Sequence, residues 1–329
     1  MNFKCFTVRK IVYICSLICL CLLFLGCADC GKMANSKKAA AGVAQSNSGY
    51  QVTDSQGYRF TMTAKPQHIV SLSISTDEIL MALVEPKRIA AITFLADDPG
   101  ISNVVEQAKQ ISGRVKDTNP EALLLHKPDL IIIPDFIKPE VIQCLRDMKI
   151  NVYVYKTPYS IAGVERNILE LGHLVGEEAR AREIVADMEK RLAHISQKLE
   201  SVKQQKRIIF HRNGGAYFSP RASFNDLCKY AKVKNALLEL NYSHAAEIAQ
   251  EEVIRLNPDI YIISGWNYDG KHDVDAYYHS IASNPAYYST RAVQNKAVYI
   301  LPGKHLFCIS QYMLEGVEDI AKVAYSDLM

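Results

Sequence analysis

The sequence predicts an α/β fold in which two Rossmann-like α/β lobes, joined by a long backbone helix, enclose a cleft. Strand-like apolar runs alternate with helix-like segments through most of the chain, and this alternation is typical of parallel sheets that helices cover on both faces. A helical pattern without strands fills residues 160–203. Residues 120–133 and 251–263 repeat one another, since each reads as a helix, a Pro-Asp turn and an apolar strand. The repeat predicts two similar lobes, and small-molecule sites usually lie between such lobes.

The first 26 residues have the pattern of a leader for export. A basic stretch over residues 1–10 precedes a 15-residue apolar run over 11–25, which is shorter than the roughly 20 residues that a membrane-spanning helix needs. The run ends in Phe24-Leu25-Gly26-Cys27, which is similar to the bacterial lipobox, where an acylated cysteine becomes the mature N-terminus. We expect a lipoprotein signal peptide over residues 1–26 and lipid on Cys27. An uncleaved signal anchor is the alternative.

A flexible tether is expected over residues 27–49, because residues 28–49 contain no aromatic residue, Leu or Ile that could pack a core. Two or three acyl chains would anchor the protein stably. We therefore place it in the cell envelope, lipid-anchored to a membrane and facing the periplasm or the cell exterior. Without the three basic residues of the leader, the body carries 35 basic and 35 acidic side chains. This balance argues against a nucleic-acid partner, which would need excess positive charge.

The first lobe is predicted over residues 50–159. Residues 50–64 alternate around a turn at Asp54–Gly57, as expected of a β-hairpin. Thr76 is the expected N-cap of the first helix. The periodicity of apolar residues predicts the remaining elements, which are strands over 68–72, 88–93, 130–133 and 152–155 and helices over 76–84, 120–126 and 139–148.

A helical backbone is predicted over residues 160–203, where apolar residues recur at steps of three and four with an interruption at Gly176. The alternation of strands and helices then restarts, which places the second lobe over residues 204–329. Its predicted elements are strands over 207–210, 260–263 and 298–301 and helices over 224–230, 251–256 and 312–324.

The cysteines give no sign of a metal site. Five of the nine lie in the leader or the lipobox, and Cys30 lies in the tether. Cys144, Cys228 and Cys308 lie far apart in the body, without CxxC or Cys/His ligand spacing. We interpret the three in the body as small buried hydrophobic residues, although a disulfide stays possible in an exported protein. We expect no resident metal and no cofactor.

Five segments carry a resemblance to a known family. They are His68-Ile-Val-Ser-Leu and its continuation to Leu80, residues 113–124, 128–133, 258–263, and Asn284-Pro-Ala-Tyr-Tyr and its continuation to Tyr299. In this order behind a lipobox, they resemble the substrate-binding lipoproteins of ABC importers, of the periplasmic binding protein family with a helical backbone. Members capture cobalamin, ferric siderophores or haem. The resemblance implies a monomer that is not an enzyme and that delivers a metal chelate, a corrinoid or an iron chelate, to a membrane permease with its ATPase.

The same resemblance implies that each lobe presents a glutamate that docks on arginines of the permease. The matching positions are Glu121 and Glu251, and one carboxylate on each lobe would fix the orientation over a two-fold permease. Glu247 and Glu252 are rivals in the second lobe. The alternative is that a glutamate in a first helical turn only complements the helix dipole.

Loops that follow the strands would form the walls of the cleft. Aromatic side chains there could stack on a flat ligand, and arginines could bind carboxylates or catecholates. The candidate ligand-binding residues are Phe94, Arg114, Arg212, Tyr217, Arg221, Trp266 and His305.

Each candidate has an alternative. Phe94 and Tyr217 could belong to the core, Arg221 could pair with Asp226, and His305 could be solvated rather than bind iron or cobalt. The loop that begins at Phe94 offers no Tyr or His for haem iron. This favours cobalamin or a ferric siderophore over haem.

Two other functions compete with this interpretation. One is a chelatase-like enzyme, with His211 beside Arg212, or Asp97 beside Asp98, as acid and base. The chain has no G-x-S-x-G, H-E-x-x-H or phosphate-loop motif that would favour catalysis. The other is a receptor for free zinc or manganese ions, which would need several converging His and carboxylate ligands.

Overall fold

The computed structural model describes residues 49–212, 215–267, 270–271 and 273–329. The predicted signal peptide, the lipidation site at Cys27 and the tether up to residue 48 lie outside this part of the chain. Within the described ranges, no helix is both long enough and apolar enough to cross a bilayer.

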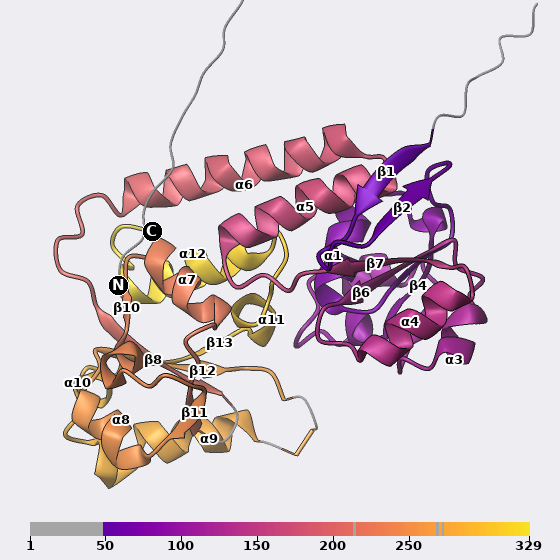
Figure 1. Cartoon of the computed structure of the whole chain (residues 1–329). Helices are drawn as coiled ribbons and strands as arrows, with labels where there is room; N and C mark the ends of the chain where they lie inside the picture. The colour runs from indigo at the N-terminus through magenta and orange to yellow at the C-terminus, as the bar shows by residue number, and fades with distance from the viewer. Residues whose placement is uncertain (1–48, 213–214, 268–269, 272) are drawn as a thin grey trace, which may run out of the picture. The chain divides into compact units, whose positions relative to one another are not determined.

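The first lobe is built on a five-stranded, wholly parallel sheet in the order β5-β4-β3-β6-β7 (Figure 1). Its strands are β3 Ile69–Ser71, β4 Ile89–Thr93, β5 Gly113–Val115, β6 Leu130–Pro134 and β7 Asn151–Tyr155. The predicted hairpin is confirmed as β1 Tyr50–Thr53 paired antiparallel with β2 Arg59–Met62. The helices are α1 Ile74–Leu83, α2 Val105–Ala108, α3 Pro120–Leu124 and α4 Pro139–Asp147, with 3-10 turns at Pro86–Arg88 and Phe94–Asp97.

The start of α1 differs from the prediction. Ser73, not Thr76, is the N-cap, because Ser73 has extended backbone angles and its side chain accepts the backbone N–H of Thr76. Thr76 is buried inside the helix, where its hydroxyl donates to the Ser73 carbonyl. Sequence alone does not distinguish two hydroxyl residues three positions apart.

The backbone consists of two helices, α5 Ile161–Val175 and α6 Glu178–Lys198. The predicted long helix is divided because Gly176 adopts a left-handed conformation with φ of 74°. The two helices run side by side (Figure 1). They pack closely, since a Cβ on Gly172 would lie 2.3 Å from the Cβ of Ala181.

The second lobe has a mixed sheet in the order β11-β9-β8-β12-β13, with β10 beside β8. The strands are β8 Arg207–Arg212, β9 Gly215–Phe218, β10 Lys234–Asn235, β11 Ala246–Ile248, β12 Ile260–Ser264 and β13 Val298–Leu301. Strand β9 runs antiparallel to both neighbours, so β11 points in the same direction as β8. The parallel pairing expected from the alternation of strands and helices is found among β10, β8, β12 and β13, and β9 is the antiparallel addition.

Helices cover the second sheet on both faces, as predicted. They are α7 Ser223–Tyr230, α8 Gln250–Leu256, α9 Val274–Ala282, α10 Arg291–Gln294, α11 Gly303–Leu306 and α12 Met313–Ala324, with 3-10 turns at Ala236–Leu240 and Pro285–Tyr287. Strands β5, β9, β10 and β11 and helices α2, α9, α10 and α11 were not predicted. These strands have at most four residues, so they give almost no periodic signal.

One hydrophobic cluster links the two sheets. It joins alternate residues of the first sheet, such as Ile132, with α1 and α5, and alternate residues of the second sheet, such as Ile262, with α7 and α12. Helix α6 contributes Met188 and Ile195 to the same cluster. The outer face of each sheet packs on a smaller separate cluster, with α3 and α4 in the first lobe and α8, α9 and α10 in the second.

Candidate functional site

The carboxyl edges of the two sheets meet through a set of hydrogen bonds. The segment after β4 contacts the segments after β12 and β13: Asn103 Nδ2 donates to the Lys304 carbonyl at 3.1 Å, and the Trp266 indole donates to Asp98 Oδ2 at 2.9 Å. Ser75 Oγ donates to the Ile309 carbonyl at 2.7 Å. Loops after strands of different lobes therefore face each other, as the sequence predicts for a two-lobed site.

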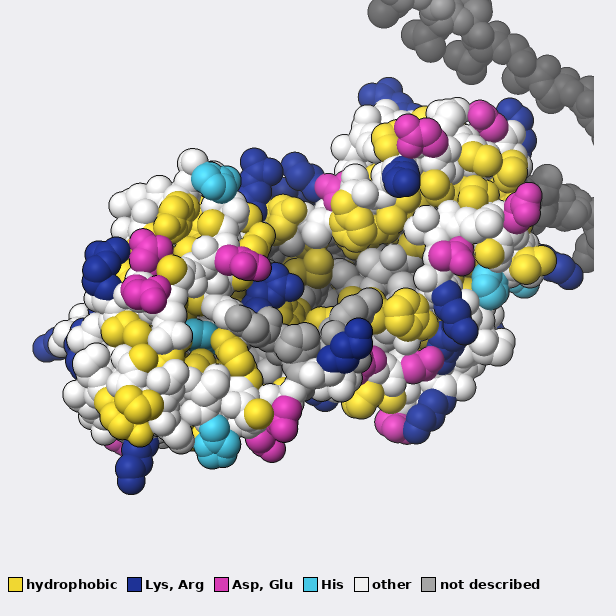
Figure 2. All heavy atoms as spheres, turned by 90° about the horizontal axis from the view of Figure 1, so that it is seen from below, with side chains coloured by type: hydrophobic (Ala, Val, Ile, Leu, Met, Phe, Trp, Pro, Cys, Tyr) yellow, Lys and Arg dark blue, Asp and Glu magenta, His cyan; other side chains and the backbone are white. Residues whose placement is uncertain are grey.

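The face of the molecule in Figure 2 is hollowed between its two halves, and hydrophobic side chains are visible in the hollow. Small residues allow the lobes to approach each other beside Trp266. A Cβ on Gly100 would come within 2.4 Å of the Trp266 ring, and a Cβ on Gly303 within 2.3 Å of the Trp266 Cβ. Glycine is therefore required on both sides of Trp266.

Trp266 and Arg212 belong to one aromatic group on the second lobe. The guanidinium of Arg212 lies 5.4 Å from the ring centre of Phe307 and 5.5 Å from that of Tyr217. The rings of Phe307 and Trp266 meet edge to face, with centres 5.8 Å apart. The structure thus brings together three of the predicted residues, and Phe307, which was not predicted, connects Arg212 to Trp266.

The missed residue had a weak signal in the sequence. Phe307 follows β13 by six positions, within the short helix-and-turn segment that includes the predicted His305. The rule that loops after strands line the site would have included it. A second ring, that of Phe210 on β8, packs against the Phe307 ring with 5.5 Å between the ring centres.

The predicted Arg114 is held within the first lobe. Its Nε and Nη2 donate to the two carboxylate oxygens of Asp97, both at 2.7 Å, and its remaining N–H groups donate to the carbonyls of Ala108, Ile111 and Gly113. The Arg114 hydrogen bond lowers the pKa of Asp97 below its ordinary value. Binding of a ligand by this guanidinium would require at least one of these bonds to break, so the role stays a prediction.

Exposed rings follow three strands of the first sheet. Phe94 follows β4 with 45% of its surface exposed, which places it outside the core. Phe136 follows β6 and Tyr159 follows β7, and they are 69% and 50% exposed. Phe136 lies in a loop that was expected to line the cleft, whereas Tyr159 was not predicted, although it obeys the same rule of position. The first lobe therefore offers apolar rings along the edge from which its loops emerge.

The other two candidates are His305 and Arg221. His305 Nδ1 is 2.6 Å from Asp319 Oδ2, so the imidazole is oriented by a carboxylate of α12. Arg221 is exposed. Asp226 Oδ2 accepts the backbone N–H of Ile161 at 2.7 Å, and among the described residues no ion pair joins Asp226 to Arg221.

The two predicted docking glutamates occupy equivalent positions. Glu121 lies in the first turn of α3, which follows the edge strand β5, and Glu251 lies in the first turn of α8, which follows the edge strand β11. Both side chains are exposed. Because β5 and β11 end at the carboxyl edges of their sheets, each lobe presents one glutamate at the outer end of that edge.

The residues named as acid and base of an enzyme each have a partner within the protein. His211 is 2% exposed, and burial lowers its pKa to about 4. Its Nδ1 pairs with the Tyr277 hydroxyl at 3.0 Å. Asp97 is paired with Arg114, and Asp98 with Trp266.

No three His, Cys, Asp or Glu residues of the described ranges lie together as metal ligands. Within the part of the chain that the structure describes, Cys144, Cys228 and Cys308 form no disulfide; Cys228 and Cys308 are buried, as interpreted, whereas Cys144 is half-buried. Cys30 lies outside the described residues.

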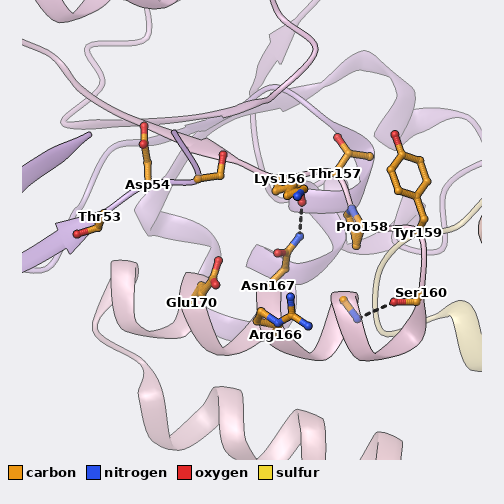
Figure 3. A pocket seen from close by; sticks show the side chains of 12 residues that line it. Thr53, Asp54, Lys156, Thr157, Pro158, Tyr159, Ser160, Arg166, Asn167 and Glu170 are labelled. Carbon is orange, nitrogen blue, oxygen red and sulfur yellow. Dashed lines mark hydrogen bonds between the residues drawn. The ribbon is translucent and has the colours of Figure 1, made fainter. Parts of the chain in front are cut away.

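A separate cavity of about 420 Å³ lies in the first lobe, between the β1–β2 turn and the start of α5 (Figure 3). Lys156, Arg166 and Glu170 line it together with hydroxyl groups such as that of Tyr159. Asn167 Nδ2 donates to the Lys156 carbonyl across its wall at 2.9 Å. None of the predicted site residues lines this cavity.

The chain is similar to known proteins over most of its length. Residues 69–305 match the family of periplasmic binding proteins. The Bacillus subtilis protein YvrC, named as an uncharacterized ABC transporter substrate-binding lipoprotein, is 24% identical over 91% of this chain and 93% of its own. The cobalamin-binding protein of Halobacterium salinarum is 21% identical over 77% of this chain and 69% of its own.

The ferric enterobactin-binding periplasmic protein FepB of Escherichia coli is 25% identical over 84% of this chain and 90% of its own. Among solved structures, Helicobacter pylori CeuE with bound Ni(II) matches with a TM-score of 0.68 at 20% identity, over 85% of this chain and 90% of that chain. At this identity the structural likeness shows the fold alone, and the two-lobed α/β architecture is the part that both proteins share.

Proposed function

The chain belongs to the periplasmic binding protein family, and on this premise we propose that it captures a metal chelate between its lobes and delivers it to the permease of an ABC importer. The chelate is cobalamin or a ferric siderophore rather than haem. Members of the family are transport components, so we propose no enzymatic activity. Relatives that bind cobalamin and ferric enterobactin support this ligand class.

The observation that carries the proposal is the aromatic group around Arg212, at the edge where the loops of both lobes meet. Rings of Phe307 and Trp266 offer the apolar contact that a large macrocyclic or aryl ligand needs. The guanidinium of Arg212 is exposed and suits a carboxylate, phosphate or catecholate group. Exposed Phe94 on the first lobe extends the apolar surface.

The equivalent positions of Glu121 and Glu251 support docking to a permease with two similar halves. We propose that each carboxylate contacts cationic residues of one half. The lipobox-like segment that ends at Cys27 supports anchoring through lipid on that cysteine. The protein would then act as a tethered monomer at the outer side of the membrane, where the permease accepts its ligand.

Binding measurements on the purified full-length chain test the proposal. Cyanocobalamin, ferric enterobactin, haemin, zinc chloride and manganese chloride would each be titrated, with calorimetry and the fluorescence of Trp266 as readouts. We expect tight one-to-one binding of cyanocobalamin or ferric enterobactin and no conversion of the recovered chelate. Tight binding of a bare ion, or release of metal from the chelate with turnover, would contradict the proposal.

A further inference from the structure

The carboxylate of Glu78 is a buried junction between the two lobes. Glu78 lies in the second turn of α1 and is 2% exposed. Within the first lobe it accepts the backbone N–H of Asn103 at 2.8 Å and its Nδ2 at 3.0 Å. From the second lobe it accepts the Ser310 hydroxyl at 2.5 Å and the Cys308 thiol at 3.3 Å. One carboxylate therefore holds four donors from two lobes.

Further bonds surround this junction and reach the candidate site. Gln311 Nε2 donates to the Glu78 carbonyl at 2.9 Å, and Asn103 Nδ2 also donates to the Lys304 carbonyl. Lys304 follows Gly303, which lies against the Trp266 side chain. The chain of contacts thus runs from Glu78 through Asn103 to the backbone that supports Trp266.

Burying a carboxylate between two surfaces costs free energy of desolvation. Burial raises the pKa of Glu78, which reflects the cost of removing its charge from water. An apolar contact of similar volume would join the lobes with less cost, but it would not fix their direction and distance as hydrogen bonds do. What distinguishes Glu78 is therefore the geometry that it imposes.

The adjacent residue provides a comparison. Asp77 is also buried, and it accepts the Thr93 backbone N–H at 3.0 Å and the Thr93 hydroxyl at 2.6 Å. Both donors belong to β4 of the first lobe, so Asp77 stabilises one lobe only. Of these two neighbouring buried carboxylates, Asp77 therefore bonds within the first lobe only, whereas Glu78 bonds to both lobes.

We propose that Glu78 is a positioning residue for ligand binding: it sets the separation of the two walls of the site without touching the ligand. This inference rests on the proposed function, because the walls are those of the proposed chelate site. Loss of the carboxylate would leave Asn103 and Ser310 without their shared acceptor. The segment that supports Trp266 would then move relative to the first lobe.

The test compares Glu78→Ala with Asp77→Ala in the full-length chain. For Glu78→Ala we expect more acrylamide quenching of Trp266 in the ligand-free protein. We also expect about tenfold weaker binding of whichever of cyanocobalamin and ferric enterobactin the wild type binds. Asp77→Ala should be less stable to urea but should keep the wild-type quenching and affinity. Folded Glu78→Ala with wild-type quenching, or an equal rise in Asp77→Ala, would overturn the inference.

Two further variants keep the test decisive where Glu78→Ala does not fold. Ser310→Ala removes the donor from the second lobe and leaves the carboxylate in place, so quenching should rise in the same direction. Glu78→Gln keeps one acceptor oxygen and should lie between the wild type and Glu78→Ala. A wild type that binds no chelate would contradict the proposed function, whereas the quenching comparison would still decide the role of Glu78.

Discussion

The indole N–H of Trp266 donates to Asp98 Oδ2 at 2.9 Å, so the only tryptophan of the chain joins the second lobe to the first. Asp98 also accepts the backbone N–H of Gly100 at 2.8 Å. The fluorescence of Trp266 therefore reports on the contact between the lobes. It reports directly on this bond, because the bond involves the ring itself.

We predict that Asp98→Ala shifts the emission of Trp266 to longer wavelength and lowers the free energy of unfolding by about 1 kcal/mol. The shift is expected because water replaces the lost carboxylate at the indole N–H. Emission spectra and urea unfolding provide the measurements. Asp97→Ala is the matched control, since it breaks the pair with Arg114 within the first lobe. An identical emission shift in both variants would count against the assignment.

Phe307→Ala is expected to weaken chelate binding by about tenfold or more, because truncating a central aromatic contact commonly costs above 1 kcal/mol. The same variant removes the ring beneath the Arg212 guanidinium. Isothermal calorimetry with the chelate that binds the wild type measures the loss. Tyr288→Ala removes an aromatic ring that is 52% exposed on the same lobe and should bind normally. Equal losses in both variants would show that Phe307 has no specific part.

Acid should destabilise the protein through His211. Its pKa is about 4 when folded and about 6.5 when unfolded, so the unfolded chain binds the extra proton between these values. Stability is therefore fully present above pH 6.5 and is lost as the pH falls towards 4, by about 1.4 kcal/mol per unit. Urea unfolding at pH 7.5 and pH 5 measures the difference. In His211→Phe this part of the pH dependence should disappear, and an unchanged slope would refute the assignment.

Replacing the docking glutamates should separate transport from binding. Glu121→Ala and Glu251→Ala should each slow uptake of the labelled chelate by cells that carry the permease, and the double variant should slow it further. Chelate affinity should stay at the wild-type value, because both side chains lie at the outer ends of the sheet edges. Glu106→Ala, an exposed glutamate of α2, is the control. Normal uptake by the double variant would exclude these positions from docking.

Sequence patterns predicted several elements of the fold closely. The predicted range of β13 is confirmed to the residue, and α7 and α12 differ from prediction by one residue at the start. These elements have strong apolar periodicity or clear ends. Strand β9 was not predicted, although it pairs with the preceding strand β8 as well as with β11, which is 28 residues further along the chain. Short strands are defined by their neighbours more than by their own residues.

The sequence predicted which residues follow the strands but not which of them touch. Such residues were expected to line the cleft, and two of them, Trp266 and Arg212, belong to one aromatic group through Phe307. No pattern in the sequence distinguishes Arg212, which lies against aromatic rings, from Arg114, which a carboxylate of its own lobe holds. Such a difference depends on side chains that the fold brings together from separate segments.

The hydrophobic cluster shared by both sheets and by α5 and α6 makes the lobes dependent on one another for folding. A fragment that ended after β7 would expose the apolar side of α1 and of its own sheet to water. We therefore expect the described part of the chain to unfold in a single cooperative transition. The two lobes could then separate only if their common core deforms. That deformation costs free energy, which the importer would have to supply when it releases the ligand.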